Sequence, residues 1–172
     1  EALREAELAL AVSPESPEAK KSVKGLKERK ARAGCLLLEI VAATRAARFE
    51  EADVKLPQTD DLWPDLDGLA EARDNLARCR GEFPRVMLAA GQAQTEKDLA
   101  KAQQAADTAV SFCPESEEAL ALLKSIKSAQ SDAEKHLKKA RAACKTADFE
   151  AARSELNQAQ KIWPRVPGLG EA

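Results

Sequence analysis

Small and apolar residues recur along this chain at helical spacing, in a register that repeats about every fifty residues. Four prolines mark the register, each fifty residues after the last: Pro14, Pro64, Pro114 and Pro164. Small or apolar residues precede these prolines at three fixed offsets: Ala2, Ala52, Ala102 and Ala152; Ala6, Leu56, Ala106 and Leu156; Ala9, Thr59, Ala109 and Ala159. Residues at these spacings share one face of an α-helix, so the pattern predicts a repeated amphipathic helix.

The same register continues after each proline. The recurring positions are Ala19, Leu69, Ala119 and Leu169; Leu26, Leu76 and Ile126; Leu37, Met87 and Leu137; Ile40, Ala90 and Ala140; Ala43, Ala93 and Ala143. A shift of one hundred residues matches better still, because Trp63-Pro64 recurs as Trp163-Pro164 and Phe49-Glu50 as Phe149-Glu150. This longer period indicates a duplicated block of two units.

Each repeat unit is predicted to contain a long helix and a short one. A small polar residue followed by proline and an acid, Ser16-Pro17-Glu18, is typical of a helix start. The apolar pattern of the long helix runs to about Ala47, and the short helix spans residues 48–62. Residues 66–112 and 116–163 repeat the scheme. Pro84 and Pro57 fall inside predicted helices, where the missing N–H should kink, split or distort them.

Composition supports an all-α fold of one domain. Alanine is abundant and aromatic residues make up only 3% of the chain, which favours helices over strands. The predicted domain covers residues 1–172. It divides into a partial unit 1–14, complete units 15–64, 65–114 and 115–164, and the start of a next unit at 165–172.

Residues 133–166 resemble a tetratricopeptide repeat. Ala140 matches the small residue of the first helix, and residues 147–152 (Ala-Asp-Phe-Glu-Ala-Ala) are similar to the family's Gly-Asp-Tyr-Glu-Glu-Ala turn. Residues 33–66 and 83–116 match more loosely. The family's unit has about 34 residues, so the first helix here is longer by over four turns at about 3.6 residues each. The resemblance implies an α-solenoid of about three helical hairpins, open at both ends, that binds proteins.

In such solenoids the first helices line a concave groove. The matching residues are Leu37, Val41, Arg45, Met87, Gly91, Gln94, Leu137, Arg141 and Lys145. They form an apolar strip with a basic margin, which would suit a peptide with acidic groups near Arg141 and Lys145. A neighbouring helix or solvent could equally cover the strip. The carboxylate clamp of chaperone-binding members is not reproduced.

Other chemically suggestive residues have structural interpretations. Trp63 and Trp163 hold equivalent positions, which favours packing between repeats over a ligand contact. His136 has no second histidine or nearby carboxylate in the sequence, so we expect it on a helix surface. The acids before Gly68 do not fit the spacing of a calcium loop. Cys35, Cys79, Cys113 and Cys144 lack metal-ligand spacing and are expected as reduced, mostly buried thiols.

Charge and hydropathy disfavour two further classes of partner, nucleic acids and membranes. The net charge is −2, with acids and bases interspersed, which does not favour a nucleic-acid partner. No apolar run approaches the roughly 20 residues of a membrane span, and no signal peptide opens the chain. We therefore expect a cytoplasmic protein with no cofactor, metal or catalytic site, acting as a protein-binding scaffold or spacer.

The alternative is a structural protein that stacks end to end. The predicted stripe begins at Ala2, and the next long helix is expected to start near Leu169. Both ends would then leave an apolar face without a neighbour, which favours frayed terminal helices or self-association.

Overall fold

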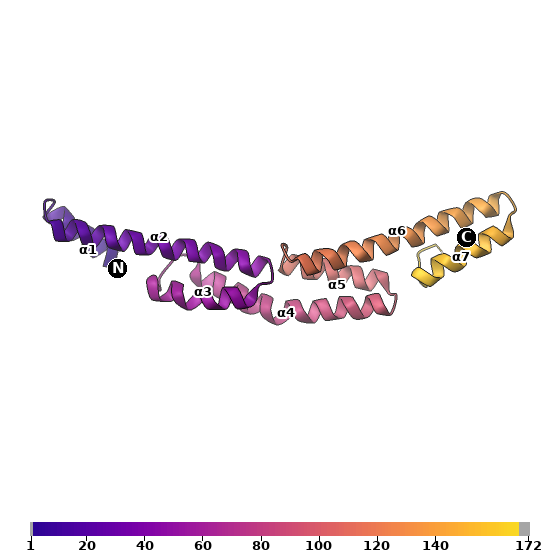
Figure 1. Cartoon of the computed structure of the whole chain (residues 1–172), viewed down its shortest axis with the longest axis horizontal. Coiled ribbons are helices and arrows are strands. Elements are labelled where there is room, and N and C mark those ends of the chain that lie inside the picture. The colour runs from indigo at the N-terminus through magenta and orange to yellow at the C-terminus, as the bar shows by residue number, and fades with distance from the viewer. Residues whose placement is uncertain (1, 169–172) are drawn as a thin grey trace. The chain divides into compact units, whose positions relative to one another are not determined.

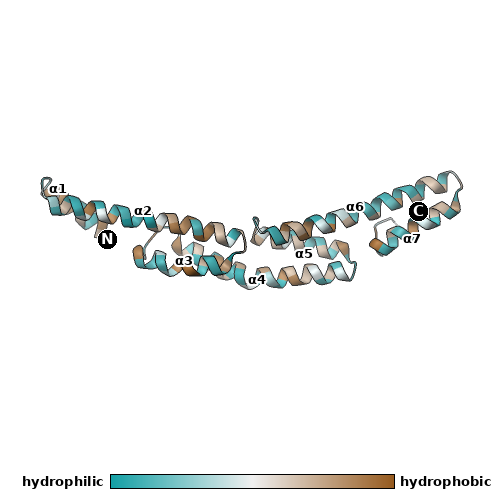
Figure 2. Ribbon diagram, viewed as in Figure 1, coloured by the Kyte–Doolittle hydropathy of each residue, from teal (hydrophilic) through white to brown (hydrophobic). Residues whose placement is uncertain are grey.

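A computed structural model describes residues 2–168 of the chain, and within this range it contains seven α-helices and no strand. They are α1 (Ala2–Val12), α2 (Pro17–Arg45), α3 (Phe49–Leu62), α4 (Leu69–Thr95), α5 (Leu99–Phe112), α6 (Glu117–Lys145) and α7 (Phe149–Ile162) (Figure 1). Apolar and hydrophilic residues are interspersed along every helix (Figure 2). The predicted all-α class is confirmed.

The chain divides into two compact units between Arg80 and Gly81, inside α4. We call them the N-terminal body and the C-terminal body and describe each by itself. The arrangement as one repeat domain stays a prediction.

The N-terminal body is built on the antiparallel hairpin of α2 and α3. Helix α2 begins where predicted, because Pro17 occupies its first turn and the Ser16 hydroxyl accepts a hydrogen bond from the Ala19 N–H at 3.2 Å. The first part of α4 (residues 69–80) packs on this hairpin. The resulting core comprises Ile40, Ala43, Ala52, Ala72 and Leu76, with Leu37, Phe49 and Leu56 packed against it.

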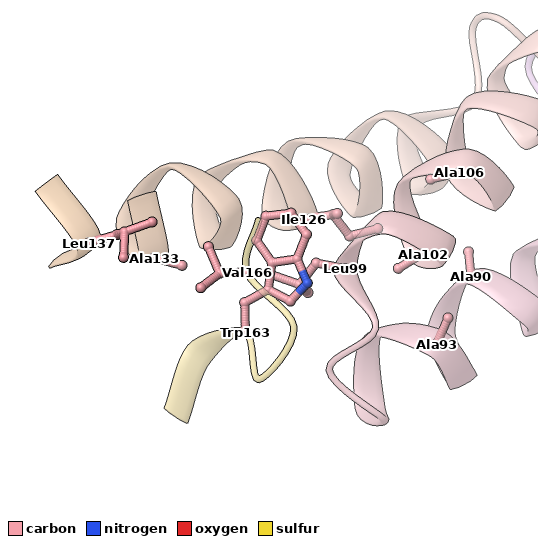
Figure 3. Packing of buried hydrophobic residues seen from close by; sticks show 10 residues of the cluster. All are labelled: Ala90, Ala93, Leu99, Ala102, Ala106, Ile126, Ala133, Leu137, Trp163 and Val166. Atoms are coloured by element: carbon pink, nitrogen blue, oxygen red, sulfur yellow. The ribbon is translucent and has the colours of Figure 1, made fainter. Parts of the chain in front are cut away.

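The C-terminal body contains the second part of α4 (residues 81–95), α5, α6 and α7. Its core comprises Ala90, Ala93, Leu99, Ala102, Ala106, Ile126, Ala133, Leu137, Trp163 and Val166 (Figure 3). The indole of Trp163, which follows α7, lies among Leu99, Ile126 and Val166. Alanines at the helix contacts let the helices approach closely, which fits their abundance in the sequence.

The predicted register agrees with the observed burial in α3, α5 and α7. The stripe residues Ala52, Thr59, Ala102, Ala109, Ala152 and Ala159 are all buried. In α1, by contrast, the equivalent Ala2 and Ala9 are exposed and no residue is fully buried. Leu169, predicted to open the next unit, lies outside the described residues.

The prolines inside helices do not break them. Pro57 lies within the continuous helix α3 and Pro84 within the continuous helix α4, so of the predicted kink or split at Pro84 the split does not occur. Both prolines are exposed. Each removes a single backbone hydrogen bond, and on an exposed face water can satisfy the carbonyl that loses its partner.

The turns after the long helices use left-handed backbone without glycine. Ala47, Lys97 and Ala147 follow α2, α4 and α6 with φ of 58°, 59° and 58°. The next N–H then reaches back into the helix, as from Arg48 to the Ala43 carbonyl at 2.8 Å. Asp98 and Asp148 cap the short helices that follow, whereas Arg48 makes no side-chain cap.

Candidate protein-binding groove

A groove with a volume of about 630 Å³ lies between α2 and the first part of α4 in the N-terminal body. We call it the α2–α4 groove. Its α2 wall carries Leu37, Leu38 and Val41, and its other wall consists of Gly68, Glu71, Ala72, Asp74, Asn75 and Arg78. Leu38 is 71% exposed and Val41 is also exposed, so the groove presents apolar side chains to solvent. An exposed apolar surface between polar rims is typical of a binding site.

Two local features shape this groove. Leu37 and Val41 lie one turn apart on α2 and therefore share a face, and Leu37 also packs against the core below. At the start of α4, Gly68 has φ of 85°, which favours glycine. A Cβ at Gly68 would lie 3.6 Å from Leu37 Cδ2, so the turn passes close to the groove floor.

The polar wall of the groove is predominantly acidic. Glu71 and Asp74 are exposed, and within the described part of the chain no ion pair neutralises either carboxylate. Arg78 is the only base among the lining residues, and it donates a hydrogen bond to Asn75 Oδ1 at 2.8 Å. This charge distribution favours a ligand with apolar and cationic groups.

The structure places only two of the predicted groove residues, Leu37 and Val41, in this groove. Arg45 lies in the last turn of α2 and Met87 is half-buried in α4, and neither lines it. Leu38 was missed because its position recurs as Leu88 in the second unit but as Lys138 in the third, so it does not belong to the stripe that is apolar in every unit. In the sequence, the apolar run Cys35-Leu36-Leu37-Leu38 was the signal that could have indicated Leu38 as a groove residue.

The remaining predicted residues belong to the C-terminal body. Gln94 donates to Ser125 Oγ at 3.0 Å, and Gly91 beside it is half-buried. Leu137 is buried in the core. Arg141 donates to the Gly168 carbonyl at 3.1 Å, and Lys145 is exposed at the end of α6.

His136 has a carboxylate partner that the sequence did not reveal. Its Nδ1 lies 2.6 Å from Glu155 Oε2, and both side chains are half-buried. The expectation of a histidine without a carboxylate was wrong because α6 and α7 are antiparallel, which brings residues nineteen positions apart together. The pair joins α6 to α7 and is therefore a helix–helix contact.

The two tryptophans differ in environment. Trp163 is only 5% exposed and lies in the core as predicted. Trp63 is half-buried and lines a smaller pocket of about 310 Å³ with Ala2, Leu26, Arg29, Leu62, Pro64 and Asp65. Trp63 is therefore less buried than Trp163, although it lies beside residues of α1 and α2.

Over residues 2–168, no three or more histidine, cysteine or acidic side chains are placed to hold a metal ion. None of the helices in that range is both long and apolar enough to span a bilayer. Cys79 and Cys113 are buried, Cys144 is half-buried and Cys35 is exposed.

Compared with protein-family models, curated proteins and solved structures, the chain matches none of them.

Proposed function

We propose that the chain is a protein-binding module, an open α-solenoid of tetratricopeptide type whose α2–α4 groove holds a segment of another protein. The observation that carries this proposal is the exposure of Leu38 and Val41 between two helices, opposite an acidic wall. Each leucine-sized side chain buried on binding would contribute about 1.5–3 kcal/mol before the costs of association. No catalytic role is proposed for the chain, and its four thiols fit the reducing cytoplasm.

The groove favours a basic amphipathic ligand. Its apolar residues would cover Leu37, Leu38 and Val41, and a lysine or arginine would lie near Glu71 and Asp74. The acidic ligand expected from the sequence belongs to another surface, because Arg141 and Lys145 are both in the C-terminal body. That expectation stays a separate prediction.

A displayed library of helical and extended peptides, selected on the whole chain, tests this proposal. We expect enriched peptides to combine aliphatic residues with lysine or arginine. Their binding should fall at least tenfold with Val41→Asp and should persist with Leu88→Ser, a matched change at an exposed leucine of α4 outside the groove. The double variant Glu71→Lys, Asp74→Lys should disfavour the basic peptides. Peptides that bind all these variants as well as the unmodified chain would refute the groove.

Self-assembly is the second candidate, and the exposed Leu8 and Val12 of α1 favour it. Light scattering over a concentration series, with Leu8→Ser and Val12→Ser as the comparison, tests it. Growth that both substitutions abolish would support assembly through α1. A monomer at all concentrations would remove this candidate.

A further inference from the structure

Helix α2 carries an open stripe of residues along most of its length. The positions of the stripe are spaced alternately by four and three residues: Lys20, Lys24, Lys27, Ala31, Gly34, Leu38, Val41 and Arg45. This spacing keeps the residues on one face, and it is the spacing by which helices pack side by side in a coiled coil. Gly34 is half-buried and the others are exposed, so the stripe is open to a helix from outside the molecule.

The equivalent stripe is also open in α4, which has helices before and after it in the chain. Gly91 is half-buried and the other positions are exposed: Ala70, Asp74, Ala77, Gly81, Pro84, Leu88 and Thr95. Leu38 and Leu88 hold equivalent positions and are 71% and 64% exposed. The packing of neighbouring units along the chain therefore leaves this face of a long helix uncovered.

The stripe of α2 has two halves of different chemistry. The first half is basic, with Lys20, Lys24 and Lys27. The second half contributes Leu38 and Val41 to the α2–α4 groove, opposite its acidic wall. The basic half suits this groove, because the stem of a lysine is apolar and its ammonium group is cationic. Within one copy these parts cannot meet, since both lie along the same continuous helix.

A second copy of α2, lying antiparallel on the first, brings the two halves together. With a two-fold axis between Ala31 and Gly34, two lysines of each copy lie opposite apolar residues of the other. The pairs are Lys27 with Leu38 and Lys24 with Val41. The outermost pair, Lys20 with Arg45, brings like charges together only at the exposed ends of the stripe, where solvent and salt screen them.

The ammonium groups of these lysines would then reach the acidic wall of the other copy. Glu71 and Asp74 line the groove opposite its apolar residues, and both are exposed. In a single copy the ion pairs of the lysines are exposed: Lys24 with Glu28 at 3.9 Å and Lys27 with Glu7 at 3.0 Å. Exposed ion pairs contribute little to stability, so the lysines can exchange them for the carboxylates of the groove.

The centre of the stripe allows two helices to approach closely. Ala31 and Gly34 lie beside the two-fold axis, and a Cβ added at Gly34 would meet nothing within 4 Å outside the adjoining turns of α2. Glycine lowers the stability of a helix interior, and packing within residues 2–168 does not require it here. A second backbone at this point would use the space that the missing side chain leaves.

We propose that a second copy of this chain fills the α2–α4 groove, in an antiparallel, two-fold symmetric dimer formed along the stripe of α2. Lys24 and Lys27 of each copy bind the acidic wall of the other. This inference rests on the proposed function, because it takes the groove as a protein-binding surface and names its occupant. It differs from assembly through α1, because a two-fold contact closes on itself and does not extend into a filament.

An exchange of charges between two variants tests the dimer. One variant carries Lys24→Glu and Lys27→Glu, and the other carries Glu71→Lys and Asp74→Lys. Each variant alone makes both halves of the interface repulsive. Because one exposed ion pair changes an affinity by about twofold to fivefold and the symmetry duplicates every pair, each should dimerise at least about tenfold more weakly than the unmodified chain. An equimolar mixture restores opposite charges in both halves and should form a one-to-one dimer, which sedimentation velocity measures.

The third repeat unit supplies a matched control for the lysines. Lys124 and Lys127 of α6 hold the positions equivalent to Lys24 and Lys27, and both are exposed. The double variant Lys124→Glu, Lys127→Glu should leave the dimer unchanged. A dimer that this variant abolishes would place α6 in the groove and would overturn the proposal.

Gly34 and Gly25 provide a second matched pair. An added Cβ meets nothing within 4 Å at either position outside the adjoining turns of α2, and Gly25 lies outside the stripe. Gly34→Glu places two carboxylates beside the two-fold axis and should abolish the dimer, whereas Gly25→Glu should leave it intact. Melting curves check that all variants are folded. Equal dimerisation of the two glycine variants would contradict the proposed axis.

The outcomes separate this inference from the proposed function. A chain that is monomeric over the whole concentration series, or a mixture of the charge variants that associates no better than each alone, would overturn the dimer. Peptides selected on the groove would in that case still support the proposed function. A dimer with all the expected dependences, without any enriched peptide, would support this inference and refute a groove for other proteins. Where both are present, the selected peptides should dissociate the dimer, and peptides that bind without displacing the second copy would overturn its place in the groove.

Discussion

Trp63 and Trp163 follow the equivalent helices α3 and α7, but only Trp163 is buried. Trp163 lies within the core of the C-terminal body, whereas Trp63 is half-buried with the Lys30 ammonium 5.8 Å from its ring centroid. The same sequence position thus supports a core in one body and forms a pocket wall in the other.

This difference predicts unequal responses to truncation. Trp163→Ala should lower the free energy of unfolding by about 3–5 kcal/mol, the usual cost of emptying a buried tryptophan site. Trp63→Ala should cost less, because part of the ring already contacts water. Urea denaturation measures both.

Acrylamide quenching provides an independent check of the two environments. The variant Trp163→Phe retains only Trp63 and should be quenched more strongly than Trp63→Phe, which retains only Trp163. Equal quenching of the two single-tryptophan variants would contradict the assigned burial.

Helix boundaries and the buried stripe were predictable because they depend on local chemistry and on periodicity. The hydroxyls of Ser16 and Ser116 cap the first turns of α2 and α6, so these serines mark the helix starts. The alanine register identifies the residues that are buried in the core. Both the capping residue and the alanine spacing lie within a few turns of one helix. They can therefore be recognised in the sequence without knowledge of the tertiary contacts.

Ala152 and Arg153 test that register directly. Ala152 is 3% exposed and Arg153 is exposed. Ala152→Asp should cost several kcal/mol because it buries a carboxylate without a partner, whereas Arg153→Asp should change stability by less than about 1 kcal/mol. Thermal melts of the two variants decide the matter, and similar losses would show that the register is misassigned.

Relationships between helices were less predictable. The contact of His136 with Glu155 and the acidic wall formed by Glu71 and Asp74 depend on which helices pack together. They also depend on the axial offset between these helices. The repeat register determines which face of a helix is buried. It does not determine which polar residues of two neighbouring helices come into contact. For this reason the sequence did not reveal the acidic wall that lies opposite Leu37 and Val41.

The left-handed turns offer a stabilising substitution. Ala147 has φ of 58°, a conformation that glycine adopts without the steric cost of a Cβ. Ala147→Gly should therefore raise the free energy of unfolding by roughly 0.5–1 kcal/mol after the greater freedom of glycine in the unfolded chain is included. Chemical denaturation measures the change.

Ala142→Gly is the matched control for this prediction. Ala142 is exposed in the last turn of α6, where the backbone is helical and glycine should lower stability by up to about 1 kcal/mol. The two alanine-to-glycine changes should therefore have opposite signs. A loss of stability at both positions would mean that the turn after α6 is not left-handed.

Lys55 in α3 joins two carboxylates and should make stability depend on pH. Its Nζ lies 3.0 Å from Glu39 Oε2 in α2 and also forms an ion pair with Glu51, one turn earlier in α3. The hydrogen bond from Lys55 lowers the pKa of Glu51 from 4.5, and hydrogen bonds to Glu51 and Glu39 raise the pKa of Lys55 from 10.5. The contribution of Glu51 is complete above its ordinary pKa and is lost as the pH falls through the lowered value. The contribution of Lys55 is complete below its ordinary pKa and is lost as the pH rises through the raised value.

We therefore expect Lys55→Met to destabilise the chain by a constant amount between pH 4.5 and 10.5, with the difference from the unmodified chain shrinking on either side. The exposed Lys127 supplies the control, because Lys127→Met removes the same positive charge and breaks no ion pair within residues 2–168. Urea midpoints of the three proteins, from below pH 4.5 to above pH 10.5, provide the measurement. The acid limb is the most informative, since protonation of Glu51 removes a carboxylate that Lys55 pairs with. A Lys55→Met difference that persists undiminished well below pH 4.5 would show that the lysine does not stabilise the chain through Glu51.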